Sequence, residues 1–412
     1  MPAVLITGAG SGIGRAAALQ FAQGGWDCLL VDISAAIDMV AAQCLQAGAR
    51  SAKAFRLDLT QTQAIAQMCA QLPPLDALVN NAGLSDTSGI ALVDQSTEQL
   101  ARLLRLNLDA PRLLFEACMP LLKHGARVVN VASGAGLKAI PWRGMYSPTK
   151  AGAIALTKGL AQAYPQWVIS VLCPGFVRTD LVQSLIDSQR LVVVDAVAKI
   201  PMGRLAEPEE IGEAIVFLAQ PTVQAFSGQV LSVDGGSSIY GGSKPCSVSA
   251  VVPLAATAAA PLLGLDASDM QWGGAVATPM QNAAAYAGVI SAAPLTPVEG
   301  VTLADAVLNA ARMFRQRYSQ SASLVVLLPH AGAGNTPDWR YATELATARM
   351  LVATLAAEWG ADALRINALV VDSAQSKATI APFVQYLAGP LAQFVTGQTL
   401  DISLKTEGAA HG

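Results

Sequence analysis

The sequence predicts an α/β fold: a doubly wound parallel sheet, followed by a truncated second α/β domain of the same type. Residues 1 to about 240 alternate short apolar runs with helical patterns, which is typical of parallel strands covered by helices on both faces. The chain has 412 residues, enough for two or three domains, and 53% of them are hydrophobic. A glycine-containing stretch at 240–245 reads as the linker between the two parts.

The elements of the first part follow from its apolar runs. The longest helical patterns are 97–123 and 147–164, and shorter ones fill the other gaps between strands. We expect strands at 3–7, 27–32, 52–57, 76–80, 126–132, 167–172 and 229–233.

A glycine-rich loop joins the first strand to the helical stretch 15–23. Gly8 would allow a tight turn, Gly12 would let the backbone approach a pyrophosphate, and Gly14 would let helix and strand pack closely. Phosphates are favoured at such a helix N-terminus by its free N–H groups and its dipole. Asp32 ends the next apolar run, about where an acid binds the adenosine ribose. The loop and the acid together predict a dinucleotide site.

Asp32 also predicts which dinucleotide binds. A carboxylate there accepts a hydrogen bond from a ribose 2′-hydroxyl and repels a 2′-phosphate, which favours NAD over NADP. Ser11, Ile33 and Ser34 add no positive charge. Arg15 is the nearby cation and is expected to face solvent. The alternative is that Asp32 only caps a helix.

A tyrosine and a lysine lie one turn apart at the start of the helical pattern 147–164. Lys150 could lower the pKa of Tyr146 electrostatically and so make a phenolate available near neutral pH. Ser133 follows a predicted buried strand, where it could hydrogen-bond a reacting oxygen. Such tyrosine–lysine pairs also arise on solvated helix faces, but here the pair accompanies a dinucleotide loop.

Over about 1–240 the sequence resembles the short-chain dehydrogenase/reductase family. The matching motifs are Thr7-Gly-Ala-Gly-Ser-Gly-Ile-Gly14, Asp58, Asn80-Asn-Ala-Gly83, Asn107, Ser133, Tyr146, Lys150, Pro174-Gly175 with Thr179, and Gly228 to Gly236. The resemblance implies a Rossmann-like fold. It also implies reversible hydride transfer between the nicotinamide of NAD and a secondary alcohol or ketone, with a hydroxy acid or hydroxyacyl compound as possible substrates.

The resemblance further implies roles for individual residues. Tyr146 would be the general acid/base, Ser133 would hold the substrate oxygen, Lys150 would hold the nicotinamide ribose, and Asn107 would position a water in the proton relay. The implied cofactor contacts are Gly8, Ser11, Gly12, Ile13, Gly14, Asp32, Ile33, Asp58, Leu59, Asn81, Ala82, Gly83, Tyr146, Lys150, Pro174, Gly175, Val177 and Thr179.

Three residues are candidates for substrate contact. Lys138 and Trp142 lie in the segment that borders the substrate pocket in relatives, and Arg190 lies in 181–199, where relatives carry a mobile lid. A cation reaching the pocket would favour a carboxylate or phosphate substrate. The alternative is that the charges face solvent and that Trp142 lies in an interface.

The second half contains weak echoes of the first, in the same order. They are 289–295 with 78–84, 324–328 and Tyr341 with 128–133 and Tyr146, 354–358 with 158–162, and 394–402 with 225–233. We interpret them as a tandem duplication whose copy lost its first strand–helix units. The alternative is a generic similarity between apolar strands and alanine-rich helices.

The second copy departs from the first at the residues that carry the chemistry. It shows no glycine-rich loop, Leu328 and Leu345 stand where the serine and lysine would be, and Tyr341 is retained without a lysine partner. We therefore predict an NAD-binding catalytic domain at 1–243. Residues 246–412 are expected to form a degenerate structural domain that is catalytically dead.

Composition excludes several other functions. The net charge is −3 without a basic run, which argues against nucleic acid, and neither the six cysteines nor the three histidines show metal-ligand spacing. The cysteines are expected to be buried thiols in a reducing cytoplasm. The uncharged stretch 245–265 is expected to be a linker and a buried strand rather than a membrane span, since it is rich in Ala, Ser and Thr. We read no signal peptide.

The expected partners are a small-molecule substrate and a second copy of the chain. In relatives the two long helices form a bundle between subunits, and the helical pattern 341–359 could supply that contact from within one chain. Two chains would then form a pseudo-tetramer; alternatively, 341–359 only covers its own sheet. The other function considered is a nucleotide-sensing or scaffolding protein without turnover, which would not need the serine, tyrosine, lysine and asparagine as a set.

Overall fold

The computed structural model describes most of the chain as two compact units. The described residues are 2–187, 191–242, 244–254, 262–265, 286–296, 298–330, 339–372 and 375–403. The first unit comprises Met1–Val192 and Leu205–Asp234, and the second comprises Val193–Arg204 and Gly235–Gly412. The boundary between the units therefore differs from the predicted domain boundary at 243–246, because the short segment 193–204 belongs to the second unit.

The first unit is the predicted doubly wound parallel sheet. Its seven strands lie in the order β3-β2-β1-β4-β5-β6-β7, and all neighbouring strands are parallel. The strands are near-continuous apolar runs because both faces of the sheet are covered. Their bounds are β1 Ala3–Thr7, β2 Asp27–Asp32, β3 Ser51–Arg56, β4 Leu75–Asn80, β5 Leu122–Val131, β6 Val168–Pro174 and β7 Val230–Val233.

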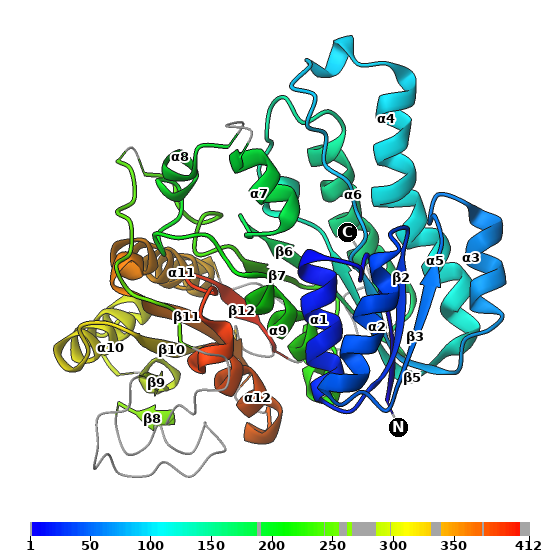
Figure 1. Cartoon of the computed structure of the whole chain (residues 1–412). Helices are drawn as coiled ribbons and strands as arrows, with labels where there is room; N and C mark the ends of the chain where they lie inside the picture. The colour runs from blue at the N-terminus through cyan, green and yellow to red at the C-terminus, as the bar shows by residue number, and fades with distance from the viewer. Residues whose placement is uncertain are drawn as a thin grey trace. The chain divides into compact units, whose positions relative to one another are not determined.

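Helices cover both faces of this sheet (Figure 1). Helix α1 packs on α2 and α9, whereas α3 packs on α5 on the other face. The helices are α1 Gly12–Gln23, α2 Ala36–Ala47, α3 Thr62–Cys69, α4 Thr97–Leu104, α5 Ala110–Cys118, α6 Tyr146–Ala163, α7 Asp180–Asp187 and α9 Pro208–Leu218.

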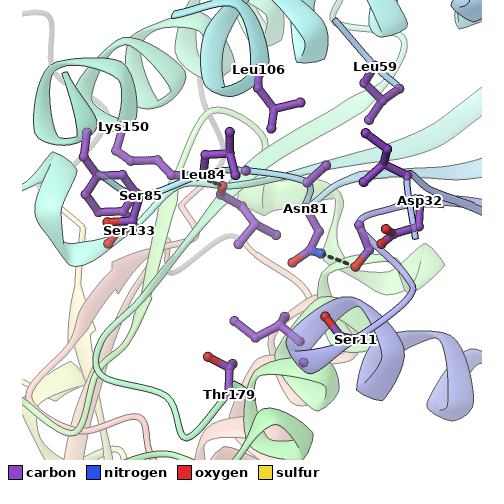
Figure 2. A pocket seen from close by; sticks show the side chains of 18 of the residues that line it. Ser11, Asp32, Leu59, Asn81, Leu84, Ser85, Leu106, Ser133, Lys150 and Thr179 are labelled. Atoms are coloured by element: carbon purple, nitrogen blue, oxygen red, sulfur yellow. Dashed lines mark hydrogen bonds between the residues drawn. The ribbon is translucent and has the colours of Figure 1, made fainter. Parts of the chain in front are cut away.

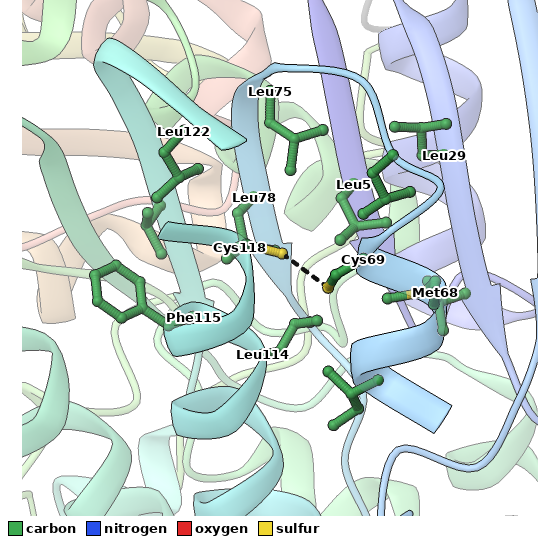
Figure 3. Packing of buried hydrophobic residues seen from close by; sticks show 14 of the residues in the cluster. Leu5, Leu29, Met68, Cys69, Leu75, Leu78, Leu114, Phe115, Cys118 and Leu122 are labelled. Carbon is green, nitrogen blue, oxygen red and sulfur yellow. Dashed lines mark hydrogen bonds between the residues drawn. The ribbon is translucent and has the colours of Figure 1, made fainter. Parts of the chain in front are cut away.

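The core between the sheet and helices α3 and α5 is built mainly from aliphatic side chains, with the aromatic rings of Phe55, Phe115 and Trp167 among them. Figure 3 shows Leu5 and Leu78 from the strands facing Leu114 and Phe115 of α5. Phe115 is 1% exposed and contacts Trp167 edge to face, with 5.7 Å between ring centres. Burying a phenylalanine side chain contributes about 1.5–3 kcal/mol. This packing fixes α5 and, through it, the segment that leads from α4 to the site.

The predicted helix 97–123 is helical over most of its length, but it is not one continuous α-helix and it ends before residue 122. A five-residue π-helical segment, Arg105–Asp109, separates α4 from α5, and β5 already begins at Leu122. Pro111 lies in the first turn of α5, where its missing N–H costs no hydrogen bond. The π-helical turn inserts one extra residue into the helical path and therefore changes where the following side chains point.

The second unit contains a five-stranded parallel sheet in the order β12-β11-β10-β9-β8. Its hydrophobic core includes the fully buried Phe314. The strands are β8 Leu262–Gly264, β9 Ala287–Ser291, β10 Ala322–Pro329, β11 Leu364–Val371 and β12 Thr399–Asp401; the helices are α8 Val193–Val197, α10 Leu303–Arg317, α11 Trp339–Trp359 and α12 Lys377–Ala388.

The two sheets have matching strand registers when their residues are aligned by the predicted sequence echoes. Strand β8 lies beside β9 as β1 lies beside β4, so the first strand is retained, contrary to the prediction; among the described strands of the copy, however, none corresponds to β2 or β3. The corresponding pairs are Leu5–Leu78 and Leu263–Val289, Leu78–Val128 and Val289–Leu324, Val128–Ile169 and Leu324–Ile366, and Val171–Val230 and Ala368–Thr399.

The register also corrects one predicted correspondence. Counting from the pairs Val128–Ile169 and Leu324–Ile366, the place of Ser133 falls on Pro329 and not on Leu328. A shift of one residue matters because successive side chains in a strand point to opposite faces. The copy was also predicted to lack a glycine-rich loop after its first strand. That stretch, 266–285, lies outside the described residues.

Segment 193–204 is held in the second unit by backbone contacts with residues much later in the chain. The Cys246 amide donates to Ala198 O at 2.8 Å, and the Ser249 amide donates to Gly203 O at 3.1 Å. The described part of 245–265 contains only the half-buried strand β8, and none of the described helices is long and apolar enough to cross a membrane.

Candidate active site

The glycine-rich loop has the conformation that the sequence predicted. Gly8 has a φ of +64°, and a Cβ at this position would lie 2.9 Å from the Ala82 Cα. A Cβ on Gly14 would lie 2.0 Å from the Gly8 carbonyl oxygen, so only glycine allows this approach of helix and loop. Helix α1 begins at Gly12, three residues earlier than predicted, and its free N–H groups favour an anion.

A cavity of 690 Å³ opens at the carboxyl ends of the parallel strands of the first unit (Figure 2). Parallel α/β sheets bind ligands at this edge. All predicted cofactor contacts line the cavity except Gly14, which packs behind the loop. The lining residues among them are Gly8, Ser11, Gly12, Ile13, Asp32, Ile33, Asp58, Leu59, Asn81, Ala82, Gly83, Tyr146, Lys150, Pro174, Gly175, Val177 and Thr179.

The Asp32 carboxylate is held in place by the backbone on both sides. One oxygen accepts a hydrogen bond from the Gly10 amide and the other from the Ser34 amide, each at 2.8 Å. Arg15 is held by Gln43, whose Oε1 lies 3.0 Å from the arginine Nε. A dinucleotide therefore meets a fixed carboxylate at the end of β2, with Arg15 engaged elsewhere.

Asp58 and Asn81 brace the same cavity. The Asp58 Oδ1 accepts from both the amide and the hydroxyl of Thr60, at 2.9 and 2.8 Å. The Asn81 Nδ2 donates to the carbonyl oxygens of Thr7 and Gly8 at 3.0 and 3.1 Å, which ties the end of β4 to the glycine-rich loop. Together with the loop conformation, these fixed groups fit a dinucleotide lying across the strand ends.

Ser133 and Lys150 lie at the end of the cavity opposite Asp32 (Figure 2), and Tyr146 joins them there, hydrogen-bonded to Ser133 and beside the Lys150 amine. Ser133 follows β5, and its hydroxyl accepts a hydrogen bond from the Ala135 amide at 3.1 Å. Tyr146 is the first residue of α6, and Lys150 follows one turn later. The Lys150 Nζ lies 5.9 Å from the centre of the Tyr146 ring and donates to Val131 O at 3.0 Å. The predicted hydroxyl, phenol and amine are thus brought together.

The pKa of Tyr146 is raised, contrary to the prediction that Lys150 lowers it. Burial is the largest cause, and a hydrogen bond from Ser133 and the charge of Arg143 offset only part of it. Burial also lowers the pKa of Lys150 to about 8, because an ammonium loses its hydration in the protein interior. In the protein alone Tyr146 is therefore a neutral phenol at neutral pH, a proton donor rather than an acceptor.

Asn107 lies behind the cavity and not on its surface. It belongs to the π-helical segment and is 2% exposed. Its Nδ2 donates to Leu84 O at 2.8 Å and to the Thr149 hydroxyl at 3.1 Å, and its Oδ1 accepts from the Leu84 amide at 2.8 Å. In this structure the side chain fixes the loop after β4 and the first turn of α6.

Two of the three predicted substrate contacts are not on the cavity wall. Lys138 and Trp142 lie in the loop between β5 and α6, are exposed and do not line the cavity. Arg190 lies outside the described residues.

Twelve residues of the cavity wall were not predicted from the sequence. They are Leu57, Thr60, Leu84, Ser85, Glu98, Arg102, Arg105, Leu106, Val131, Ala132, Asp180 and Val182.

Arg102 lies in the last turn of α4, and Arg105 begins the π-helical segment that follows it. Arg102 and Arg105 are one turn apart, and Arg105 forms an ion pair with Glu98. Their spacing placed them on one helix face, but nothing in the sequence indicated that this face borders the cavity. With Lys150 they are the cations of the wall, as far as the described residues show.

Comparison with known proteins gives a consistent match to the first unit. The sequence profile of a family described as enoyl-(acyl carrier protein) reductase matches residues 8–238. A short-chain type dehydrogenase/reductase of uncharacterised activity from Sinorhizobium fredii is 34% identical over 242 residues. The match covers 57% of this chain and only 43% of that relative.

Two further relatives carry more specific descriptions. A 2-keto-3-deoxy-L-fuconate dehydrogenase from Xanthomonas campestris is 34% identical, over 56% of this chain and 78% of its own. A solved structure from Beutenbergia cavernae, described as an NAD(P)-dependent gluconate 5-dehydrogenase with NADP bound at low occupancy, is 31% identical. It has a TM-score of 0.53 and covers 57% of this chain and 96% of its own.

Proposed function

Because the chain belongs to the short-chain dehydrogenase/reductase family over residues 8–238, we propose that it interconverts a ketone and a secondary alcohol with NAD(H). One observation carries the proposal. Ser133, Tyr146 and Lys150 lie at one end of the cavity whose other end holds the glycine-rich loop and Asp32. A dinucleotide bound along that cavity would bring its nicotinamide end to the phenol.

Each residue then has a role that its environment supports. The bound nicotinamide would supply or accept the hydride at its C4. Ser133 would hold the carbonyl oxygen, and the neutral phenol of Tyr146 would donate its proton to that oxygen during reduction. Lys150 would stabilise the resulting phenolate with its ammonium charge. Oxidation of the alcohol runs the same steps in reverse, with the tyrosine accepting the proton.

The preference for NAD over NADP rests on Asp32. Its carboxylate is fixed by two backbone amides, so it cannot move away from a 2′-phosphate without losing both hydrogen bonds. Arg15 is held by Gln43. Arg56 is paired with Asp32 in the register of β2 and β3, and its Nε donates to Ile33 O at 3.3 Å. Because the similar structure from Beutenbergia cavernae contains NADP, the preference of this protein has to be measured with both NAD(H) and NADP(H).

For the second unit we propose a degenerate copy with a structural role. The matching strand registers support the duplication, and Pro329 and Leu345 stand where the first unit has Ser133 and Lys150. Neither residue can hold a substrate oxygen or a phenolate. We further propose that residues 246–412 stabilise the catalytic domain and that the chain forms a homodimer, which sedimentation of the full chain would test.

The decisive experiment is a turnover screen. Incubation with NAD⁺ and a panel of secondary alcohols and hydroxy acids, or with NADH and the matching ketones, is followed at 340 nm. We expect turnover of at least one neutral alcohol–ketone pair and its loss in Tyr146→Phe. Tight cofactor binding without turnover of any pair would instead favour the nucleotide-sensing alternative.

A further inference from the structure

The second unit has a cavity of its own, at the carboxyl ends of β9 and β10. Its volume is 390 Å³, within the range of small-molecule sites. Ser291 ends β9, Pro329 ends β10, and helix α10 supplies the opposite wall. The described walls also include Leu265, Ala293, Pro294, Thr296, Val298, Val301, Thr302, Leu303, Ala306, Asn309, Ala310, Met313, Tyr341 and Glu344.

This cavity occupies the place in its sheet that the candidate active site occupies in the first. The strand registers give three of the corresponding pairs, and the sequence echo, which puts Tyr341 in the first turn of α11, gives the fourth; both members of each pair line their own cavity. The pairs are Ala293 with Ala82, Pro294 with Gly83, Pro329 with Ser133, and Tyr341 with Tyr146. The duplication therefore kept the pocket while it replaced the serine and lysine.

The Tyr341 hydroxyl needs a hydrogen-bond partner that the described chain does not provide. The oxygen is buried, and no described group bonds to it. Leaving a buried hydroxyl without a partner is unfavourable, which is why such groups in native proteins usually have a protein, water or ligand partner. Burial raises the pKa of Tyr341 to about 12, so the group is a neutral donor.

The charge of the walls indicates which molecules fit. Among the described wall residues Glu344 is the only charged one, and its Oε2 accepts from the Leu303 amide at 3.3 Å. A phosphate or carboxylate would meet this acid with no described cation on the wall to balance it. Leu265, Val301 and Met313 give the cavity an apolar lining that favours a neutral, apolar molecule.

We propose that this cavity is a second binding site, for a neutral and largely apolar carbonyl compound whose oxygen accepts a hydrogen bond from Tyr341. The site binds without turnover, since Pro329 and Leu345 replace the serine and lysine that the chemistry would require. No part of this inference depends on catalysis in the first unit.

The test is a titration read at one residue of the pocket. Full-length protein carrying ¹³C-methyl methionine is titrated with 2-acetylnaphthalene, and the Met313 methyl signal is identified by its disappearance in Met313→Leu. Two matched probes follow: 2-isopropenylnaphthalene, which replaces the carbonyl oxygen by a methylene, and 2-naphthoate, which carries a charge. Reading Met313 separates this site from binding of the same ketone near Tyr146.

We expect the ketone to shift the Met313 signal saturably and to bind about three- to tenfold more tightly than the alkene, the range of one hydrogen bond. Tyr341→Phe should remove that difference, whereas Tyr318→Phe, a tyrosine of the same unit outside the pocket, should keep it. If Tyr341→Phe fails to fold, the comparison of ketone and alkene on the native chain still decides the matter. An unmoved Met313 signal, equal affinities for ketone and alkene, or tighter binding of 2-naphthoate would overturn the proposal.

Discussion

The two tyrosines at the starts of α6 and α11 show how one position acquires different chemistry from its neighbours. Burial raises the pKa of both. Tyr146, however, receives a hydrogen bond from Ser133 and lies near Lys150, whereas Tyr341 has no hydroxyl partner among the described residues. The phenol alone therefore gives a hydrogen-bond donor, and its two neighbours are what would make it an acid/base.

The largest expected difference between the two tyrosines appears when the hydroxyl of each is removed in turn. Tyr146→Phe should lower kcat by about 10²–10⁴, the usual contribution of a general acid/base, while NAD binding stays within about twofold. Tyr341→Phe is the matched control and should leave kcat and KM unchanged. Both variants are measured by steady-state kinetics and by titration with NADH. A folded Tyr146→Phe with near-native kcat would remove this residue from the mechanism.

The second prediction asks whether the two units depend on each other for stability. Phe115 and Phe314 are phenylalanines at most 1% exposed in the two cores, and replacing either by alanine should destabilise its own unit by about 3–5 kcal/mol. If the second unit supports the first, Phe314→Ala should also lower the temperature at which activity is lost. Calorimetry and residual-activity curves of both variants check this. Unchanged heat inactivation in Phe314→Ala would contradict the structural role.

The third prediction concerns pH. The pKa of Lys150 is lowered to about 8, so its stabilising positive charge is present below that pH and is lost above it. In the direction of ketone reduction, kcat/KM for NADH, which reports the free enzyme, should fall about tenfold per pH unit above about pH 8. Lys150→Arg keeps the charge at all these pH values and should abolish the fall, although its activity is lower. A native profile flat to pH 10 would exclude Lys150 as the titrating group.

The smallest expected effect is on cofactor choice. A 2′-phosphate facing the fixed Asp32 carboxylate should weaken NADP(H) relative to NAD(H) by about tenfold or more, equivalent to 1–3 kcal/mol. Asp32→Ser should narrow that ratio, and Arg56→Gln in the native background should widen it if the arginine reaches a 2′-phosphate. Kinetics with both cofactors measure the ratio. Equal kcat/KM for the two native reactions would show that a cation compensates for Asp32.

Much of the site could be predicted because its determinants are local in sequence. The turn at Gly8 and the spacing of Tyr146 and Lys150 each depend on a few consecutive residues, and the structure has both as expected. The electrostatics could not be predicted, since the raised pKa of Tyr146 comes from burial by distant segments. The same holds for Arg102, which reaches the cavity wall through tertiary packing of α4.

In the fold, errors arose where tertiary contacts override local preference. The helical pattern 97–123 continues through the π-helical turn, so periodicity did not reveal the break or the role of Asn107 in holding Leu84. A strand was expected within 245–265, and β8 lies there, but its three residues carry too little pattern to show that it corresponds to β1; its pairing with β9 gives that place.

The contacts of segment 193–204 have a consequence for how the chain is made. Ala198 and Gly203 leave the ribosome about 45 residues before their backbone partners Cys246 and Ser249, at a synthesis rate of about 5–20 residues per second. Ser249 in turn bonds Ala361 O, more than a hundred residues later. The nascent first domain must therefore wait for several seconds with this stretch unpaired. A stop codon placed after the last residue of the seven-stranded sheet would therefore leave segment 193–204 without the backbone partners it has in the full chain.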